Sequence, residues 1–181
     1  MPDRYVALFR GINVGKAKRI AMADLRALLE SLGYTRVRTL LNSGNAVFDG
    51  ATAATTKHAQ RIQAAVLAEL SVDALVIVKS AADIHAAIDG NTLRDIATDP
   101  SRLIVAFTKD ATSLAALQSM ADTEGGTEAV HVGKHAAYVW CANGILDSKV
   151  AVAVLKNLAQ SGTTRNASTV EKIRVLMQDA D

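Results

Sequence analysis

The chain has a single cysteine, few aromatic residues and no apolar run long enough to cross a bilayer. Because Cys141 has no second cysteine to pair with, no internal disulfide can form, and we expect a reducing compartment. Aromatic residues make up 4% of the chain, so its core must consist mainly of Ala, Val, Leu and Ile. A membrane-spanning helix needs ~20 apolar residues, and no signal-peptide pattern is seen. We therefore predict a cytoplasmic protein without membrane partners.

The sequence also lacks a strong excess of either charge. Its 20 Lys and Arg residues nearly balance 18 Asp and Glu residues, which leaves a formal net charge of +2. This mild positive charge suits a small anionic ligand but is far from the charge typical of nucleic-acid-binding proteins. Half of the 181 residues are hydrophobic, enough for the core of one domain or of two small, tightly joined ones.

The first eighty residues follow the order strand, helix, strand, strand, helix, strand. Strands are expected where apolar residues cluster, and helices where apolar residues recur every three or four positions. The expected elements are strands at 5–10, 37–41, 46–48 and 75–78, and helices at 22–32 and 55–70. A turn through Asn42–Asn45 joins the two middle strands. This is the order of the ferredoxin-like split unit.

Residues 81–100 are expected to form a helical connection that ends before Pro100. The first-half order then recurs in residues 101–181. The expected elements are strands at 103–107, 130–132 and 137–140, helices around 114–120 and at 150–159, a short strand near 162–165, and a helix at 169–178. We predict an α/β (α+β) fold of two ferredoxin-like βαββαβ-type halves packed together, 1–80 and 101–181, the second with an extra C-terminal helix.

Two of these strands, 75–78 and 103–107, are uninterrupted apolar runs. Such runs are typical of strands buried on both faces. Helices would cover one face of each sheet, and the other half of the molecule could cover the second.

The loop Gly11–Lys16 lies between a predicted strand and a predicted helix, as phosphate-binding loops do. A nucleotide-binding P-loop needs four residues between its glycines and a Ser or Thr after the lysine. Here three residues separate Gly11 from Gly15, and Ala17 follows Lys16, so no magnesium ligand is supplied. Either the glycines only permit backbone turns, or Arg10, Asn13 or Lys16 contacts some other anion.

The turn residues Ser43-Gly44-Asn45 are all turn formers, and a hairpin turn alone accounts for them. The first and third strands are neighbours in a ferredoxin-like sheet. Ser43 and Asn45 are therefore also expected beside the first loop, where both segments could offer hydrogen bonds to a ligand.

Near the C-terminus, Ser168 and Glu171 have the spacing of a capping box for the last helix. Ser148 would cap the preceding helix, with Lys149 solvated in its first turn. Capping leaves Arg165 and Asn166 unexplained. An arginine next to a helix start can hold a carboxylate or phosphate, and it can equally pair with an acidic side chain.

The four histidines do not predict a metal site. A two-residue hairpin turn at Gly133-Lys134 would pair Val132 with His135 and place His131 on the opposite face of the hairpin. Cys141 is expected to be a small core residue at a strand end. We expect no metal and no cofactor, and no motif identifies a catalytic residue.

Several of these segments together resemble a family of mostly bacterial proteins called domain of unknown function 1697. The resemblance rests on Arg10–Lys16, Ser43–Asn45, Gly144 with Ser148-Lys149, and Thr164–Asn166 followed by Thr169. It covers nearly the whole chain and implies two ferredoxin-like parts, but no activity. One departure is Ala167, where the resemblance implies a bulky aromatic residue; if that residue lines a pocket, the pocket of this chain is altered.

Three functions remain open. We favour a small-molecule binding protein or enzyme whose polar residues orient an anionic ligand where the two halves meet. The candidate ligand-binding residues are Arg10, Asn13, Lys16, Ser43, Asn45, Ser148, Lys149, Arg165 and Asn166. The second interpretation is a structural or assembly protein in which these residues only stabilise turns. The third is a nucleic-acid-binding module, which is disfavoured because the strand at 46–48 supplies only Phe48 for stacking on bases.

Overall fold

A computed structural model describes residues 2–121 and 127–179. The chain divides into two compact units. Unit 1 comprises Met1–Ala82 and Ile173–Asp181, and unit 2 comprises Asp83–Lys172. The division falls inside two helices, α3 (Ala81–Asp89) and α7 (Ala167–Gln178), so each of these helices contributes residues to both units.

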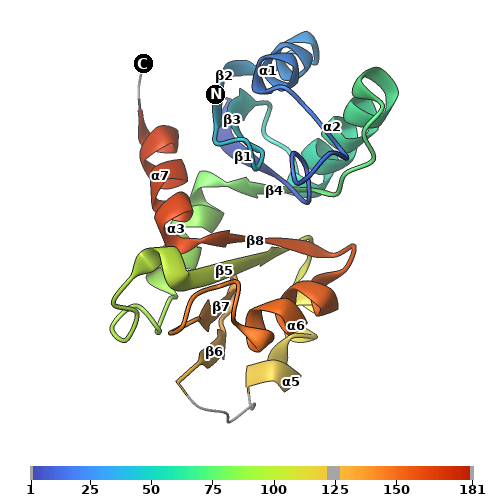
Figure 1. The fold of residues 1–181 in the computed structure, drawn as a ribbon. Coiled ribbons are helices and arrows are strands. Elements are labelled where there is room, and N and C mark those ends of the chain that lie inside the picture. The colour runs from blue at the N-terminus through green and yellow to red at the C-terminus, as the bar shows by residue number, and fades with distance from the viewer. Residues whose placement is uncertain (1, 122–126, 180–181) are drawn as a thin grey trace. The chain divides into compact units, whose positions relative to one another are not determined.

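Unit 1 contains a four-stranded antiparallel sheet in the order β2-β3-β1-β4 (Figure 1). Its elements in chain order are β1 (Asp3–Phe9), α1 (Met22–Ser31), β2 (Thr35–Leu40), β3 (Asn45–Gly50), α2 (Thr55–Leu70) and β4 (Val76–Ser80). This is the ferredoxin-like arrangement that the sequence predicts, with each element within a few residues of its expected bounds.

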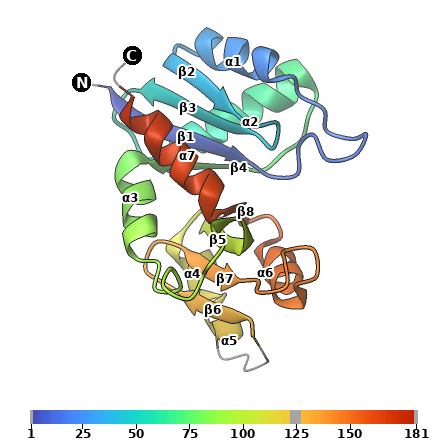
Figure 2. The ribbon, with the colours of Figure 1, turned by 60° about the vertical axis from the view of Figure 1, so that its left-hand side comes forward.

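The core of unit 1 lies between the sheet and its two helices, which cover the same sheet face (Figure 2). Tyr5, Ala7 and Phe9 alternate along β1 and pack with apolar residues spaced along the helices, such as Leu25 and Ile62. The intervening β1 residues are also buried, and so are all three apolar residues of β4. The uninterrupted apolar run at 75–78 therefore does correspond to a strand buried on both faces.

Unit 2 repeats this topology, with the strand order β6-β7-β5-β8. Its elements after α3 are the 3-10 turn Pro100–Arg102, β5 (Leu103–Thr108), α4 (Ala111–Ala115), α5 (Gln118–Ala121), β6 (Ala129–Val132), β7 (Ala137–Trp140), α6 (Lys149–Leu158), β8 (Gly162–Asn166) and α7. Strand β8 supplies the final strand predicted near 162–165, and it pairs antiparallel with β5. Ile104 and Ala106 of β5 pack on Leu114 of α4 and Val154 of α6. The extra C-terminal helix is α7.

The predicted two-residue turn between β6 and β7 is wrong. Val132 pairs with Ala137 rather than with His135, so four residues, 133–136, form the loop. The amide of Gly133 donates to the carbonyl of Ala136 at 2.9 Å and closes this longer loop. His131 pairs with Tyr138 on β7, and the two rings stack with their centroids 5.9 Å apart.

Two helix boundaries also differ from those expected. Helix α3 ends at Asp89, well before Pro100, and Gly90 follows it. Pro100 instead begins a 3-10 turn, in which the Asp99 carboxylate accepts a hydrogen bond from the amide of Ser101. Helix α7 begins at Ala167, so Ser168 lies inside the helix and is not its N-cap.

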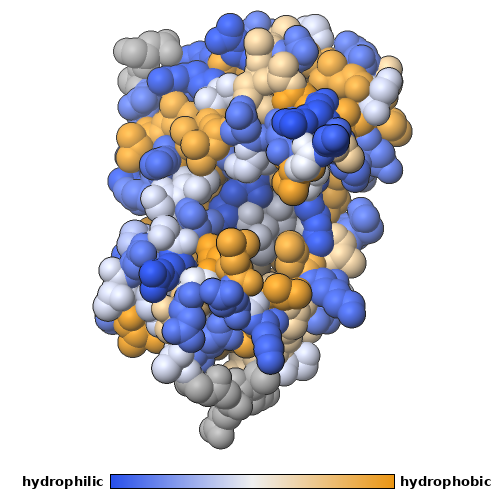
Figure 3. Space-filling view, viewed as in Figure 1, coloured by the Kyte–Doolittle hydropathy of each residue, from blue (hydrophilic) through white to orange (hydrophobic). Residues whose placement is uncertain are grey.

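No helix of the described residues combines the length and apolar character needed to cross a membrane. On the face shown in Figure 3, hydrophilic side chains are interspersed with hydrophobic ones over both units.

Candidate functional site

In unit 1, the loop 11–19 is attached to the turn between β2 and β3 by the side chain of Asn13. Its Nδ2 donates to the carbonyl oxygens of Ile20 and Asn42, both at 2.8 Å, and its Oδ1 accepts from the amide of Ile20 at 2.9 Å. Asn13 has a left-handed backbone, φ 56°, which asparagine tolerates better than most residues. Asn13 therefore links the loop to the turn.

The turn 41–44 is held just as closely. Asn45 is fully buried, and its Nδ2 donates to the carbonyl of Leu40 at 2.8 Å and to Oγ of Ser43 at 3.3 Å. At Gly44, φ is +88° and an added Cβ would lie 2.5 Å from Cδ1 of Ile12, so only glycine fits. The expected proximity of Ser43 and Asn45 to the first loop is therefore confirmed. Their role in ligand binding stays a prediction.

A cavity of about 270 Å³ lies where the loop meets the turn, lined by Asn13, Arg19, Ile20, Ala21 and Asn42. Arg19 and Asn42 are exposed, and within residues 2–121 and 127–179 their side chains make no hydrogen bond or ion pair. Neither side chain is among the candidate ligand-binding residues predicted from the sequence. The signal that could have found them is their position, one at the end of the glycine loop and the other at the start of the turn.

Positive charge is concentrated in this part of unit 1. Arg10, Lys16, Lys18 and Arg19 lie within ten residues, and no acidic residue occurs between Asp3 and Asp24. Lys16, Lys18 and Arg19 are exposed. Arg10 is half-buried, and burial lowers the pKa of its guanidinium. Helix α1 begins only at Met22, in line with the sequence-based argument against a nucleotide-binding P-loop.

The other predicted site residues, Ser148, Lys149, Arg165 and Asn166, lie in unit 2. Ser148 caps α6 as predicted, since its Oγ accepts from the amide of Ala151 at 2.9 Å. Lys149 is exposed at the first position of that helix. That these four residues join the unit 1 group in one site stays a prediction.

Asn166 and Arg165 have structural partners of their own. The Oδ1 of Asn166 accepts from the amide of Thr169 at 2.8 Å, so Asn166 performs the capping role that the sequence analysis gave to Ser168. Arg165 is buried and donates from Nη1 to Oγ1 of Thr163 and to the carbonyl of Thr164. Burial lowers the pKa of Arg165 to about 10, which leaves it charged at neutral pH.

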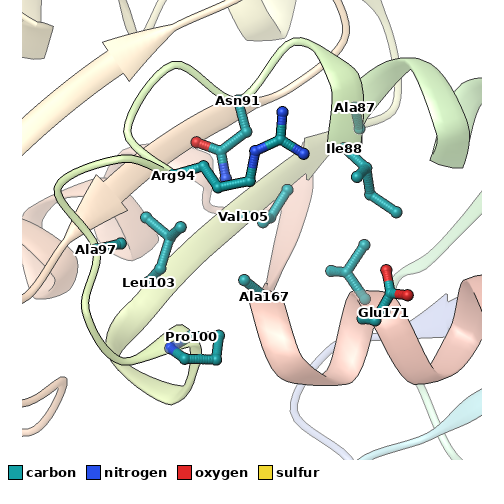
Figure 4. Close-up of a pocket in the computed structure, with 11 residues that line it drawn as sticks. Ala87, Ile88, Asn91, Arg94, Ala97, Pro100, Leu103, Val105, Ala167 and Glu171 are labelled. Atoms are coloured by element: carbon teal, nitrogen blue, oxygen red, sulfur yellow. The ribbon is translucent and has the colours of Figure 1, made fainter.

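A second cavity, of about 190 Å³, lies inside unit 2 (Figure 4). It is bordered by α3, the segment between α3 and β5, strand β5 itself and the first turns of α7. Ala167, the position where the resemblance implies an aromatic residue, lines it. The sequence does not indicate this cavity, because residues 90–98 are expected from it to continue the connecting helix, whereas α3 ends at Asp89.

No histidine or cysteine cluster of the described residues forms a metal site: no group of three or more His, Cys, Asp or Glu side chains is suitably placed. His58 is buried among Tyr5, Tyr34 and Phe48. Cys141 is part of the unit 2 core, as expected, and burial raises the pKa of its thiol.

Comparison with known proteins agrees with this fold. Residues 2–138 match a family model described as a protein of unknown function (DUF1697). The chain belongs to this family. A solved structure described as the conserved bacterial protein SP0830 from Streptococcus pneumoniae is similar to this DUF1697 chain, with a TM-score of 0.75 and 21% sequence identity. The similarity covers 98% of this chain and 100% of that one. It shows a shared fold. No curated protein matches, so function has to be argued from this chain's own residues.

Proposed function

We propose that the chain binds a small anionic molecule on the loop–turn surface of unit 1, formed by residues 11–19 and 41–44. The observation that carries the proposal is the cavity at this surface, which Arg19 and Asn42 line with side chains that make no bond to the described residues. A guanidinium and an amide beside one cavity offer several N–H donors to an oxyanion.

The surrounding charge supports the same ligand class. Lys16 and Lys18 are exposed on the same loop as Arg19, and the nearest acidic residue along the chain is Asp24. Three cations without an interspersed acid favour a ligand with more than one negative charge, such as a phosphate ester or pyrophosphate. The chain supplies no Ser or Thr after Lys16 to hold magnesium, so the proposal concerns binding and not nucleotide hydrolysis.

The loop is also prepared for binding. Asn13 holds it by three hydrogen bonds, and Asn45 holds the facing turn by two. A binding loop that is already ordered loses less conformational entropy when a ligand arrives. Asn13 and Asn45 are therefore positioning residues in this proposal, while Arg19, Lys16 and Asn42 contact the ligand.

A small molecule is favoured over RNA because β3 offers no stacking platform. Phe48 is fully buried, in contact with the rings of Tyr5, Tyr34 and His58. Sequence-tolerant binding of single strands depends on exposed aromatic side chains.

The proposal is tested by calorimetric titration of the full chain with inorganic pyrophosphate. We expect Arg19→Met to weaken binding about tenfold, because a charge-assisted hydrogen bond is lost. Arg26→Met is the matched control, since Arg26 is exposed on α1 and, among the described residues, its side chain has only a 3.8 Å contact with Glu30. Binding should also weaken as salt is added.

Three results would contradict the proposal. Absence of pyrophosphate binding would favour the structural interpretation, in which Asn13 and Asn45 only stabilise the turns. Equal losses in Arg19→Met and Arg26→Met would indicate nonspecific attraction to the whole protein. Tighter binding of single-stranded RNA than of pyrophosphate, lost in Arg19→Met, would favour the nucleic-acid interpretation.

A further inference from the structure

The cavity of unit 2 is separate from the loop–turn surface and has a different chemistry. Eight of its eleven lining residues are apolar. The principal ones are Ile88, Pro100, Leu103, Val105, Ala167 and Val170. At about 190 Å³ it exceeds the ~150 Å³ of an apolar cavity known to hold benzene. By volume it can therefore accommodate a six-membered ring with a short substituent.

Buried contacts stabilise the walls of the cavity. Leu103 and Val105 are nearly fully buried in β5, and the register places Tyr138 of β7 opposite Val105. The hydroxyl of Tyr138 donates to the carbonyl of Ala87, a residue of α3 that lines the cavity. Burial raises the pKa of Tyr138 to about 12, so this donor keeps its proton at neutral pH. This hydrogen bond joins β7 to α3 beside the cavity.

Two polar residues of the segment that follows α3, Asn91 and Arg94, line the cavity, and Arg94 is also exposed to solvent. Asn91 is 9% exposed, and its Oδ1 accepts from the amide of Leu93 at 3.1 Å. That bond identifies the oxygen, so the other atom is Nδ2, which makes no hydrogen bond with any described residue. Arg94 likewise has no carboxylate or other partner within the described part of the chain.

Figure 4 shows where these groups lie in the cavity. Asn91 and Arg94 are on the same side, with Leu103, Val105 and Ala167 beside them, and Glu171 approaches from α7 on another side. Nδ2 of Asn91 has no acceptor among the described residues and is not fully buried, so it can donate to a ligand or to water in the cavity. Asn91 and Arg94 therefore offer hydrogen-bond donors to an anion at one side of an otherwise largely apolar cavity.

We propose that this cavity binds a small apolar monocarboxylate. The planar guanidinium of Arg94 and the Nδ2–H of Asn91 take the two carboxylate oxygens, and the apolar body lies against Ile88, Leu103 and Val105. One arginine and one amide match a planar carboxylate better than they match a tetrahedral phosphate, because the N–H donors of the guanidinium lie in one plane. A ligand of this size reaches a Kd of roughly millimolar to micromolar.

The remaining charged groups refine the ligand class. Glu171 brings a carboxylate to the cavity, which disfavours a second negative charge on the ligand and selects monocarboxylates over dicarboxylates. Arg165 lies directly opposite Val105 in the β5–β8 register, on the same sheet face, and is charged at neutral pH. Arg165 does not line the cavity itself, but its positive charge one strand away from Val105 favours an anion there over a cation.

The test is a calorimetric titration of the full chain with benzoate and with benzamide, its neutral isostere. We expect benzoate to bind at least about tenfold more tightly than benzamide, and Arg94→Met to remove this difference. Asn91→Asp keeps the oxygen that accepts from Leu93 but replaces Nδ2 by a second oxygen, so it should weaken benzoate binding by a similar factor. Arg26→Met should bind benzoate like the unchanged chain.

A variant that fills the cavity tests whether benzoate binds there. Ala167→Phe adds a ring at the cavity wall and should abolish benzoate binding while the melting temperature is kept or raised. Arg19→Met should leave benzoate binding unchanged, which separates this proposal from that for the loop–turn surface. The proposal is overturned if benzoate does not bind at millimolar concentration, if benzamide binds equally well, or if folded Ala167→Phe still binds benzoate.

Discussion

His58 shows how one buried side chain couples stability to pH. It is 6% exposed, its Nε2 lies 3.1 Å from the carbonyl of Ala51, and its Nδ1 lies 2.9 Å from the hydroxyl of Tyr34. Because a carbonyl can only accept, Nε2 carries the proton and Nδ1 accepts from Tyr34. Burial is the main effect on His58 and lowers its pKa. The hydrogen bond to Ala51 raises the pKa and the positive charge of Arg61 lowers it, so that the pKa is lowered overall.

We predict that stability falls as the pH drops below about 6.5, the ordinary histidine value, because the unfolded chain then takes up a proton that folded His58 resists. Above that pH the contribution is fully present. His58→Gln should cost about 1 kcal/mol at pH 7 through its poorer hydrogen bonds. It should also flatten the pH dependence of urea unfolding between about pH 7 and 5.5.

His135→Gln is the control for this prediction, since His135 is exposed in the loop before β7. It should keep the pH dependence. If stability depends on pH equally steeply in His58→Gln and in the unchanged chain, groups other than His58 cause the pH dependence.

Asp49 is the second residue whose charge matters for folding. It is 6% exposed and accepts from Arg36 at 2.6 Å and from Arg4 at 2.8 Å. Burial alone would raise the pKa of its carboxyl, but the hydrogen bonds from the two arginines hold the pKa below its ordinary value. Arg4 is itself largely buried, and its Nε has no hydrogen-bond partner in the described residues.

We predict that Asp49→Asn lowers the free energy of unfolding by about 3 kcal/mol, because it leaves the buried Arg4 charge without its carboxylate. Asp179→Asn is the matched control, since the Arg38–Asp179 pair is about half exposed, and it should cost no more than about 0.5 kcal/mol. Urea unfolding of both variants measures the difference. Equal costs would show that burial of the Asp49 pair does not matter.

At the scale of secondary structure, the two predicted helix starts of unit 2 had different outcomes. Ser148 is the residue before α6 and caps it, as its position in the sequence indicates. For α7 the capping-box spacing pointed to Ser168, but the helix begins one residue after Asn166, whose side chain bonds the amide of Thr169. Strand β8 determines this start, because Asn166 is still paired with Ile104 of β5.

We predict that Asn166→Ala lowers the free energy of unfolding by about 1 kcal/mol through the lost cap. Ser168→Ala, inside the first turn of α7, should change it by less than about 0.5 kcal/mol. Thermal melts of the two variants decide the assignment. A larger loss of stability in Ser168→Ala than in Asn166→Ala would show that Ser168 caps α7 after all.

At the scale of the whole molecule, α7 is shared between the units. Its first residues line the unit 2 cavity, and its last turns belong to unit 1, where Arg4 donates to the carbonyl of Leu176 at 3.3 Å. A cation at the C-terminal end of a helix also interacts favourably with the helix dipole. Ile173 and Met177 in these last turns are buried, whereas Val175 between them is exposed.

We predict that the double variant Ile173→Ala, Met177→Ala lowers the stability of unit 1 by about 4 kcal/mol, since each truncation removes a buried side chain. Far-UV circular dichroism should report an earlier urea transition. Trp140, the sole tryptophan of the chain, lies in unit 2, so its fluorescence should shift less. Val175→Ala should leave both signals unchanged. A fluorescence shift as large as the dichroism shift would contradict the assignment of these residues to unit 1.

The sequence by itself determined the order of elements in both halves and hence the ferredoxin-like topology, because alternation and helical spacing of apolar residues are local patterns. It also indicated that Ser148 caps a helix and that the loop beginning at Gly11 lies beside the Ser43–Asn45 turn. Only the tertiary structure decided the register of β6 on β7, the end of α3 at Asp89 and the cap of α7. Each of these depends on a partner strand or a packed neighbour distant in the sequence.

The same distinction applies to the candidate sites. Asn13 and Asn45 could be found in the sequence because they accompany glycines in turns, but their hydrogen bonds turn out to hold the backbone. Arg19, Asn42, Asn91 and Arg94 carry no local signature, since an exposed or half-enclosed polar side chain looks the same in sequence whether or not a cavity lies beside it. Cavities form between elements, and the spacing of those elements is decided by how the strands and helices pack.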